Sequence, residues 1–176
     1  MDLPSPVQDR MNIATNQHFR GFAGRYSGSL KTPDLAIQFE NDAGVPKIKF
    51  ILEVGFSETS QDLVEDARLW LEGKDEVSLV VLVKFTEIPS YQCPARNLDD
   101  EKLEQLEFSE SADIRVMVFN SEREYGPITY KGLQWVGRIS EAFMELWRRN
   151  QATGLATKVG RRRVRLLNIL KDSTLC

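Results

Sequence analysis

The sequence of 176 residues predicts an α/β protein with a mixed central sheet and helices on both faces, arranged in three layers. Two observations support this class. Short apolar runs typical of strands alternate with segments whose apolar residues recur at three- and four-residue steps, as in helices. The order of these segments is strand, strand, helix, strand, strand, helix. The length suits one globular domain, which we place at residues 33–150.

The first part of that domain is predicted to be a hairpin. Leu35–Phe39 and Ile48–Val54 have the composition of strands, and a polar, turn-like segment separates them. The preceding residues 1–32 form a polar, glycine-rich segment that is expected to be partly irregular, with at most a short helix around Asn12–Phe19.

A helix follows the hairpin. Ser60 is a suitable N-cap and Gly73 a suitable stop, and the apolar residues between them have helical spacing: Leu63, Val64, Ala67, Trp70 and Leu71. Val77–Phe85 is almost continuously apolar and predicts a central strand that is covered on both faces. Ile114–Phe119 repeats that pattern over a shorter stretch.

The remaining segments are more polar. The acidic run Asp99–Glu110 is interpreted as a solvated surface excursion, with a short helix over Asp100–Leu106. Lys131–Asn150 is predicted to be an amphipathic helix, because its apolar residues form one stripe opposite charged ones. Residues 151–176 are interpreted as a basic C-terminal segment, either a short basic helix or a disordered tail.

The charge of the chain is unevenly distributed. The formal net charge is −3, but the residues from 158 onward carry +5 and the remainder −8. An anionic partner is therefore expected at the basic end, and nucleic acid is the leading candidate. The cations expected to contact it are Arg161, Arg162, Arg163 and Arg165. A nuclear import signal or a solvated helix face is the alternative interpretation of this run.

The composition also excludes several classes. Cys93 and Cys176 are too few for a disulfide framework, and His18 is the single histidine, so a zinc centre is not expected. We find no signal-peptide pattern and no apolar run that could span a membrane. The sequence thus predicts an intracellular protein, cytoplasmic or nuclear, without membrane contact, and any metal would be held by oxygen.

Two carboxylates stand at the same end of the predicted hairpin. Asp34 precedes the first strand and Glu53 ends the second, and these positions are neighbours when the strands are antiparallel. Two adjacent carboxylates repel each other unless a hard cation such as Mg²⁺ or Mn²⁺ binds oxygen atoms of both. Strand alternation places Glu53 on the same face as Ile51. A turn role for Asp34, and an ion pair for Glu53, are the structural alternatives.

Pro33-Asp34 followed by Glu53-Val54 resembles the signature of the PD-(D/E)XK restriction-endonuclease-like superfamily. The stretch Glu53–Ser57, together with Asp62-Leu63 and Ala67–Trp70, is similar in particular to the Uma2-like branch and to uncharacterised fungal proteins with that core. The resemblance covers residues 32–87. It implies a restriction-endonuclease-like α/β/α core and, in active members, divalent-metal nuclease activity with Mg²⁺ or Mn²⁺.

The chain departs from this pattern at the motif lysine. Gly55 occupies the usual lysine position, and Asp66 occupies the helix position at which Uma2-like proteins carry it. Arg68 and Lys84 are the predicted replacements. The cation matters because it can orient the attacking water and offset charge on the phosphate.

Three functional hypotheses follow. The first is a metal-dependent nuclease with Asp34 and Glu53 as metal ligands and Arg68 and Lys84 as catalytic cations. The second is a catalytically inactive nuclease-fold module that binds nucleic acid or a protein partner. The third is an assembly protein that forms a homodimer through the helix predicted at residues 131–150. In all three, the tryptophans are expected to be core residues rather than base-stacking ones.

Overall fold

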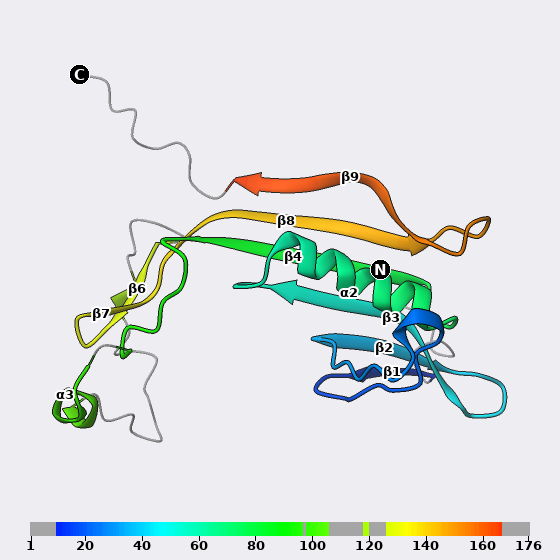
Figure 1. Ribbon diagram of the computed structural model, residues 1–176, viewed down its shortest axis with the longest axis horizontal. Coiled ribbons are helices and arrows are strands. Elements are labelled where there is room, and N and C mark those ends of the chain that lie inside the picture. The colour runs from blue at the N-terminus through cyan, green and yellow to red at the C-terminus, as the bar shows by residue number, and fades with distance from the viewer. Residues whose placement is uncertain (1–9, 97, 106–117, 120–125, 167–176) are drawn as a thin grey trace. The chain divides into compact units, whose positions relative to one another are not determined.

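The computed structural model describes residues 10–96, 98–105, 118–119 and 126–166. It confirms an α/β protein with a mixed sheet (Figure 1). The chain divides into two compact units. The described residues of the first are 10–84 and 143–163, and those of the second are 164–166 together with the described positions between 85 and 142.

The main sheet has six strands. Their order is β1 (Met11–Ala14), β2 (Leu35–Glu40), β3 (Pro46–Gly55), β4 (Leu79–Ile88), β8 (Arg138–Arg149) and β9 (Ala156–Leu166). The predicted hairpin is confirmed, since β2 and β3 pair antiparallel with a register irregularity between Ile37 and Gln38. β3 and β4 are parallel, and α2 (Ser60–Gly73) makes the crossover between them.

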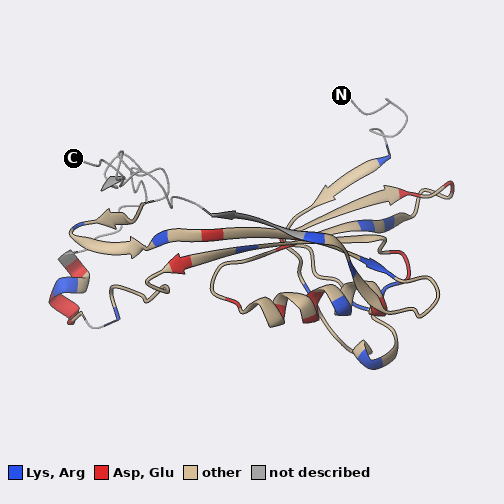
Figure 2. Ribbon diagram, turned by 90° about the horizontal axis from the view of Figure 1, so that it is seen from above, with Lys and Arg blue, Asp and Glu red and all other residues tan. Residues whose placement is uncertain are grey.

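Strand alternation decides which side chains of β3 meet the helix. Ile51, Glu53 and Gly55 are buried on the face that α2 covers, whereas Leu52 and Val54 are half-buried on the other face. The prediction that Glu53 shares a face with Ile51 is therefore confirmed. Figure 2 shows α2 along one side of the sheet. Within the described part of the first unit no second helical layer is present, so that layer stays a prediction.

The N-cap of α2 lies one residue earlier than predicted. Thr59 is the N-cap, and its side chain and that of Asp62 form a reciprocal capping box with the two backbone N–H groups. The stripe of Leu63, Ala67 and Trp70 faces the sheet and is fully buried. Lys74 is the C-cap, so Gly73 belongs to the last turn rather than acting as the stop.

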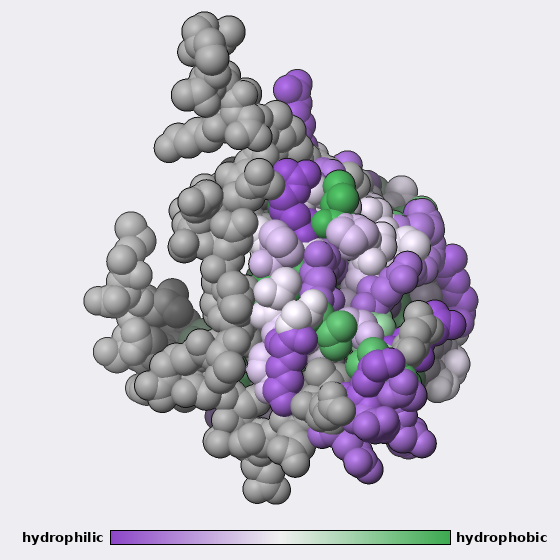
Figure 3. Space-filling view, turned by 90° about the vertical axis from the view of Figure 1, so that its left-hand side faces the viewer, coloured by the Kyte–Doolittle hydropathy of each residue, from purple (hydrophilic) through white to green (hydrophobic). Residues whose placement is uncertain are grey.

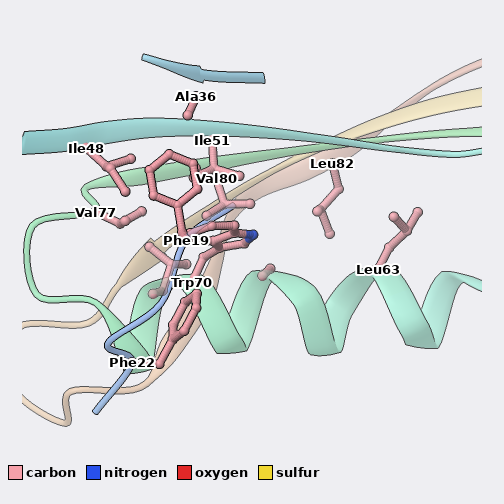
Figure 4. Close-up of a cluster of buried hydrophobic side chains, with 12 residues drawn as sticks. Phe19, Phe22, Ala36, Ile48, Ile51, Leu63, Trp70, Val77, Val80 and Leu82 are labelled. Atoms are coloured by element: carbon pink, nitrogen blue, oxygen red, sulfur yellow. The ribbon is translucent and has the colours of Figure 1, made fainter. Parts of the chain in front are cut away.

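Trp70 is the centre of the hydrophobic core. The rings of Phe19 and Phe22 pack edge-on against it, with centroid distances of 5.7 and 5.2 Å. Figure 4 shows the rings of Phe19 and Trp70 near the buried aliphatic side chains of the sheet, among them Ile51 and Val80, and the ring of Phe22 beside the helix. The core therefore joins α2, the central strands and the segment before β2.

The short helix expected around Asn12–Phe19 is wrong. Residues 11–14 form strand β1, which pairs antiparallel with β2 in the register Ile13↔Ile37. Asn and Thr residues in this stretch have low helix propensity, and the unpaired edge of β2 offers its backbone groups a ladder. The segment then continues through a short 3-10 helix, Gly24–Tyr26.

The amphipathic helix predicted over Lys131–Asn150 is also wrong. Lys131 and Gly132 both have positive φ, and Tyr130 pairs with Leu133, which is the geometry of a tight hairpin turn. The chain then forms β7 (Leu133–Val136) and β8, which are separated by Gly137. The homodimer hypothesis loses the helical face on which it was based.

The basic segment is neither a helix nor a tail over its described length. A turn closed by hydrogen bonds between Asn150 and both Gly154 and Leu155 leads into β9. The backbone of Arg161, Arg162, Arg163 and Arg165 belongs to this strand. Arg161 is exposed, and the side chains of the other three lie outside the described residues.

The second unit contains a small sheet and a short helix. The sheet consists of β5 (Val118–Phe119), β6 (Ile128–Tyr130) and β7, and α3 spans Asp100–Gln105, close to the helix predicted there. Of the strand predicted at 114–119, residues 114–117 lie outside the described part. Figure 3 shows one face of the molecule, on which the described side chains are mostly hydrophilic, with separate hydrophobic ones among them. No described helix has the length and apolar character needed to cross a membrane.

Removing a buried side chain from the sheet–helix contact should destabilise the fold strongly. Ile51 is 0% exposed, so Ile51→Ala should lower the free energy of unfolding by about 2–5 kcal/mol. Leu155→Ala is the control because Leu155 is 57% exposed, and it should change that free energy by less than about 0.5 kcal/mol. Urea denaturation followed by circular dichroism measures both values. Equal losses would contradict this assignment of the core.

Candidate functional site

Glu53 is a buried carboxylate that forms no direct ion pair with any described residue. It is 5% exposed, and its Oε1 accepts a hydrogen bond of 2.6 Å from Nε1 of Trp70. Burial raises the pKa of Glu53 to about 7, although the Trp70 hydrogen bond and the charge of Lys31 oppose this shift. The charges of Asp66 and Asp34 raise the pKa further. None of the ion pairs among the described residues includes Glu53.

Asp34 stands beside Glu53 at the end of the hairpin, as predicted. β2 and β3 are in the register Leu35↔Leu52, and one further step along it places Asp34 opposite Glu53. The Oδ2 atom of Asp34 accepts a hydrogen bond of 2.7 Å from the backbone N–H of Val54. This bond fixes the exposed carboxylate next to the buried one.

Lys31 is the cation with the largest effect on Glu53. Its Nζ forms an ion pair of 2.7 Å with Oδ1 of Asp66 on α2, and both side chains are largely buried. Burial alone would lower the pKa of Lys31. The hydrogen bond to Asp66 and the charges of Glu53, Asp66 and Glu58 outweigh that penalty, so the pKa is raised and the ammonium stays charged.

Sequence reasoning missed Lys31. It lies three residues before Asp34, in a segment that was expected to be irregular. Its position is fixed by a bridge to Phe19, with backbone hydrogen bonds of 2.8 and 3.1 Å in the two directions. The spacing to Asp34 was the one available signal. Without the bridge, that spacing does not indicate where the side chain points.

The two predicted replacement cations have other contacts. Arg68 pairs with Glu65, one turn earlier on the exposed side of α2. Lys84 is buried on β4 in register with Gly55, and its Nζ donates a hydrogen bond of 2.7 Å to the carbonyl oxygen of Phe56. Lys84 therefore stands in the row where the motif lysine would be, but on the neighbouring strand.

Packing explains why no lysine occupies position 55. A Cβ atom on Gly55 would lie 2.7 Å from Cδ1 and 3.1 Å from Cγ of Leu63, which is itself fully buried. Any side chain at this position would force the side chain of Leu63 to shift. A cation that replaces the motif lysine would therefore have to come from another part of the chain.

A second buried carboxylate lies elsewhere in the first unit. Glu145 on β8 is 3% exposed, accepts a hydrogen bond of 3.0 Å from Nε1 of Trp147 and forms an ion pair of 3.5 Å with Lys158 on β9. Sequence reasoning placed Glu145 on the solvated face of a helix. Its burial follows from the alternation of β8, which puts Phe143 and Glu145 on the same face.

Asp34 and Glu53 offer carboxylate oxygens to a hard divalent cation, and two carboxylates are close to the smallest number of protein ligands that such an ion uses. No group of three or more His, Cys, Asp or Glu side chains able to hold a metal occurs among the described residues. Mg²⁺ nevertheless binds through one or two carboxylates when substrate phosphates and waters complete its shell. Glu53 is a buried carboxylate next to a second carboxylate, and no described residue forms an ion pair with it; a divalent ion would stabilise such an arrangement.

Comparison with known proteins adds no family to these observations. No family model, no curated protein and no solved structure matches this chain.

The buried carboxylate should make stability depend on pH. The pKa of Glu53 is about 7 in the folded state and 4.5 ordinarily, so the folded protein holds this proton more tightly. The free energy of unfolding should therefore fall as the pH rises from about 4.5 to about 7. The contribution of Glu53 to this loss is up to about 3 kcal/mol, and above pH 7 it should not change further. Glu53→Gln should remove this component. We would measure urea unfolding of both proteins from pH 4.5 to 8, and parallel curves would contradict the assignment.

A side chain at position 55 should conflict with Leu63. Gly55→Ala should destabilise the protein by about 1–3 kcal/mol, because its Cβ overlaps Leu63. In a Leu63→Ala background the same change should cost much less, since the overlapping atoms are gone. A double-mutant cycle on unfolding free energies tests this coupling. Additive losses would show that the two positions do not meet.

Proposed function

We propose that this chain is a metal-dependent phosphodiesterase of the PD-(D/E)XK type that hydrolyses nucleic acid. Asp34 and Glu53 would hold one Mg²⁺ or Mn²⁺ ion. The observation that supports this most is the buried Glu53 carboxylate, which has Asp34 beside it and a charged Lys31 acting on it without a direct ion pair. Carboxylates are the donors, and a lysine the accessory cation, that hydrolysis of a phosphodiester requires.

Each residue has a separate role in this proposal. A bound ion would polarise a phosphoryl oxygen and lower the pKa of a bound water. Trp70 holds the Glu53 carboxylate in one orientation, and the Val54 N–H does the same for Asp34. Lys31 offsets the negative charge that develops on the phosphate. Its ion pair with Asp66 positions the ammonium group next to the carboxylates.

The proposal includes a three-layer, restriction-endonuclease-like core. The apolar character of the sheet face opposite α2 supports a second layer. Two cross-strand rows there are Ile37, Phe50 and Leu79, and then Leu35, Leu52 and Val81. Parallel strands such as β3 and β4 are usually covered on both faces, so side chains of this kind would be expected to pack against further structure.

A catalytically inactive module on the same fold is the second candidate. It is favoured by Gly55, where packing against Leu63 excludes the motif lysine, and by the two-carboxylate donor set. Such a module would bind nucleic acid or a protein partner. The basic strand β9, with Arg161 exposed, is its expected contact for phosphates.

A cleavage assay tests the enzyme. Purified protein should cleave single-stranded DNA, duplex DNA or RNA in the presence of Mg²⁺ or Mn²⁺, and chelation should stop the reaction. Glu53→Gln and Lys31→Met should each lower the rate on the order of 10²-fold or more, the first because it removes a charged ligand of the ion and the second because it removes positive charge near the phosphate. Asp42→Asn and Lys49→Met are matched controls on the exposed part of the same hairpin and should leave the rate unchanged.

The outcomes separate the two candidates. If the folded protein cleaves no substrate with either ion, the enzyme is excluded. Binding to nucleic acid that weakens with rising salt, without cleavage, would identify the inactive module.

A further inference from the structure

The second unit contains a pocket of about 420 Å³, which is within the range of small-ligand sites. The segment that follows β4 forms one wall, and β7 with Gly137 forms the other. The residues that give it its character are Tyr91, Trp135, Pro89, Pro94, Gln92 and Gln134. Aromatic rings and prolines thus alternate with primary amides around one cavity.

The floor of this pocket is fixed by close backbone contact. The buried Glu87 carboxylate accepts a hydrogen bond from the N–H of Gly137. A Cβ atom on Gly137 would lie 2.7 Å from the carbonyl oxygen of Pro89, so only glycine allows the two walls to approach this closely. Ser140 adds a hydrogen bond of 3.1 Å to the carbonyl oxygen of Thr86. The walls are therefore held in place before any ligand arrives.

Two aromatic side chains, Trp135 and Tyr91, line this pocket. Nε1 of Trp135 already donates to the carbonyl oxygen of Tyr130 at 3.3 Å, which uses the indole N–H and orients the ring. Tyr91 is 52% exposed and lines the same cavity. Aromatic side chains of this kind stack on flat rings such as nucleobases.

The polar groups of the pocket match the edge of such a ring. Gln92 and Gln134 each offer an amide donor and an acceptor, which is the complement that nucleobase edges require. Among the described lining residues none is Lys or Arg, and the one acid, Glu87, is buried on the floor. The pocket therefore suits an uncharged planar ring and not a phosphate.

We propose that this pocket binds a nucleobase of single-stranded nucleic acid, stacked on Trp135 and Tyr91 with its edge facing the two glutamine amides. A base in a duplex cannot enter, because it is stacked and paired. The choice of nucleic acid rests in part on the proposed function, but binding here needs neither the metal ion nor the carboxylate pair.

Fluorescence anisotropy with labelled 12-nucleotide oligo(dT) and oligo(dA), in EDTA, tests this proposal. Tyr91→Ala and Trp135→Ala should each weaken single-strand binding roughly 5- to 100-fold, the effect of losing one stacked base. Tyr91→Phe and Trp135→Phe keep a ring and should retain most of the affinity. A duplex of the same sequence should show no comparable loss. Tyr91→Ala is the safer variant for folding, since that side chain is half exposed.

The failure of this proposal can be distinguished from failure of the nuclease. Alanine variants that bind as tightly as the original protein, or a decaproline peptide that binds the pocket in place of the oligonucleotides, would overturn the nucleobase site. Asp42→Asn, an exposed control outside both sites, should bind oligonucleotides normally in EDTA. If the protein cleaves nothing but its binding depends on Tyr91, the nucleobase site stands and the enzyme does not.

Discussion

The contact between Glu53 and Trp70 joins the hydrophobic core to the candidate site. A carboxylate between a sheet and a helix loses its hydration, and one hydrogen bond from an indole compensates only part of that cost. The pKa of Glu53 therefore remains near neutrality, far above that of an exposed glutamate. Trp70 cannot move to relieve this, because Phe19 and Phe22 pack against its ring. The position of the acid is consequently as rigid as the core itself.

The segment before β2 supplies what the hairpin and helix lack. It is tied to the end of α2 by hydrogen bonds from Ala23 N to Gly73 O at 2.8 Å and from Lys74 Nζ to Arg20 O at 2.7 Å. It delivers two aromatic rings to the core and then, at Lys31, a cation to the carboxylates. The same residues thus stabilise the fold and set the electrostatics of the site.

Local patterns in the sequence were sufficient to predict the hairpin, the helix α2 and the adjacent positions of Asp34 and Glu53. In each case the signal was short in range: alternation, helical spacing or adjacency across a turn. The roles of Lys31 and Gly55 could be recognised only in the tertiary structure. They depend on the bridge from Lys31 to Phe19 and on the packing of Leu63 against Gly55. The prediction of a helix over residues 131–150 was wrong for another reason. Its apolar residues satisfy both helical and strand spacing, and the tight turn at Lys131–Gly132 decides between them.

Comparison with the second buried glutamate, Glu145, shows which feature of Glu53 points to a bound cation. Glu145 also accepts a hydrogen bond from a tryptophan, so burial against an indole is by itself a structural arrangement. Its charge, however, is met directly by Lys158, whereas the lysine near Glu53 is bound to Asp66. Glu145 is thus a completed ion pair. At Glu53 two further carboxylates, Asp34 and Asp66, act on the same proton, and among the described residues one ammonium group is shared with Asp66. The excess of negative charge at Glu53, rather than its burial, is what a divalent cation would neutralise.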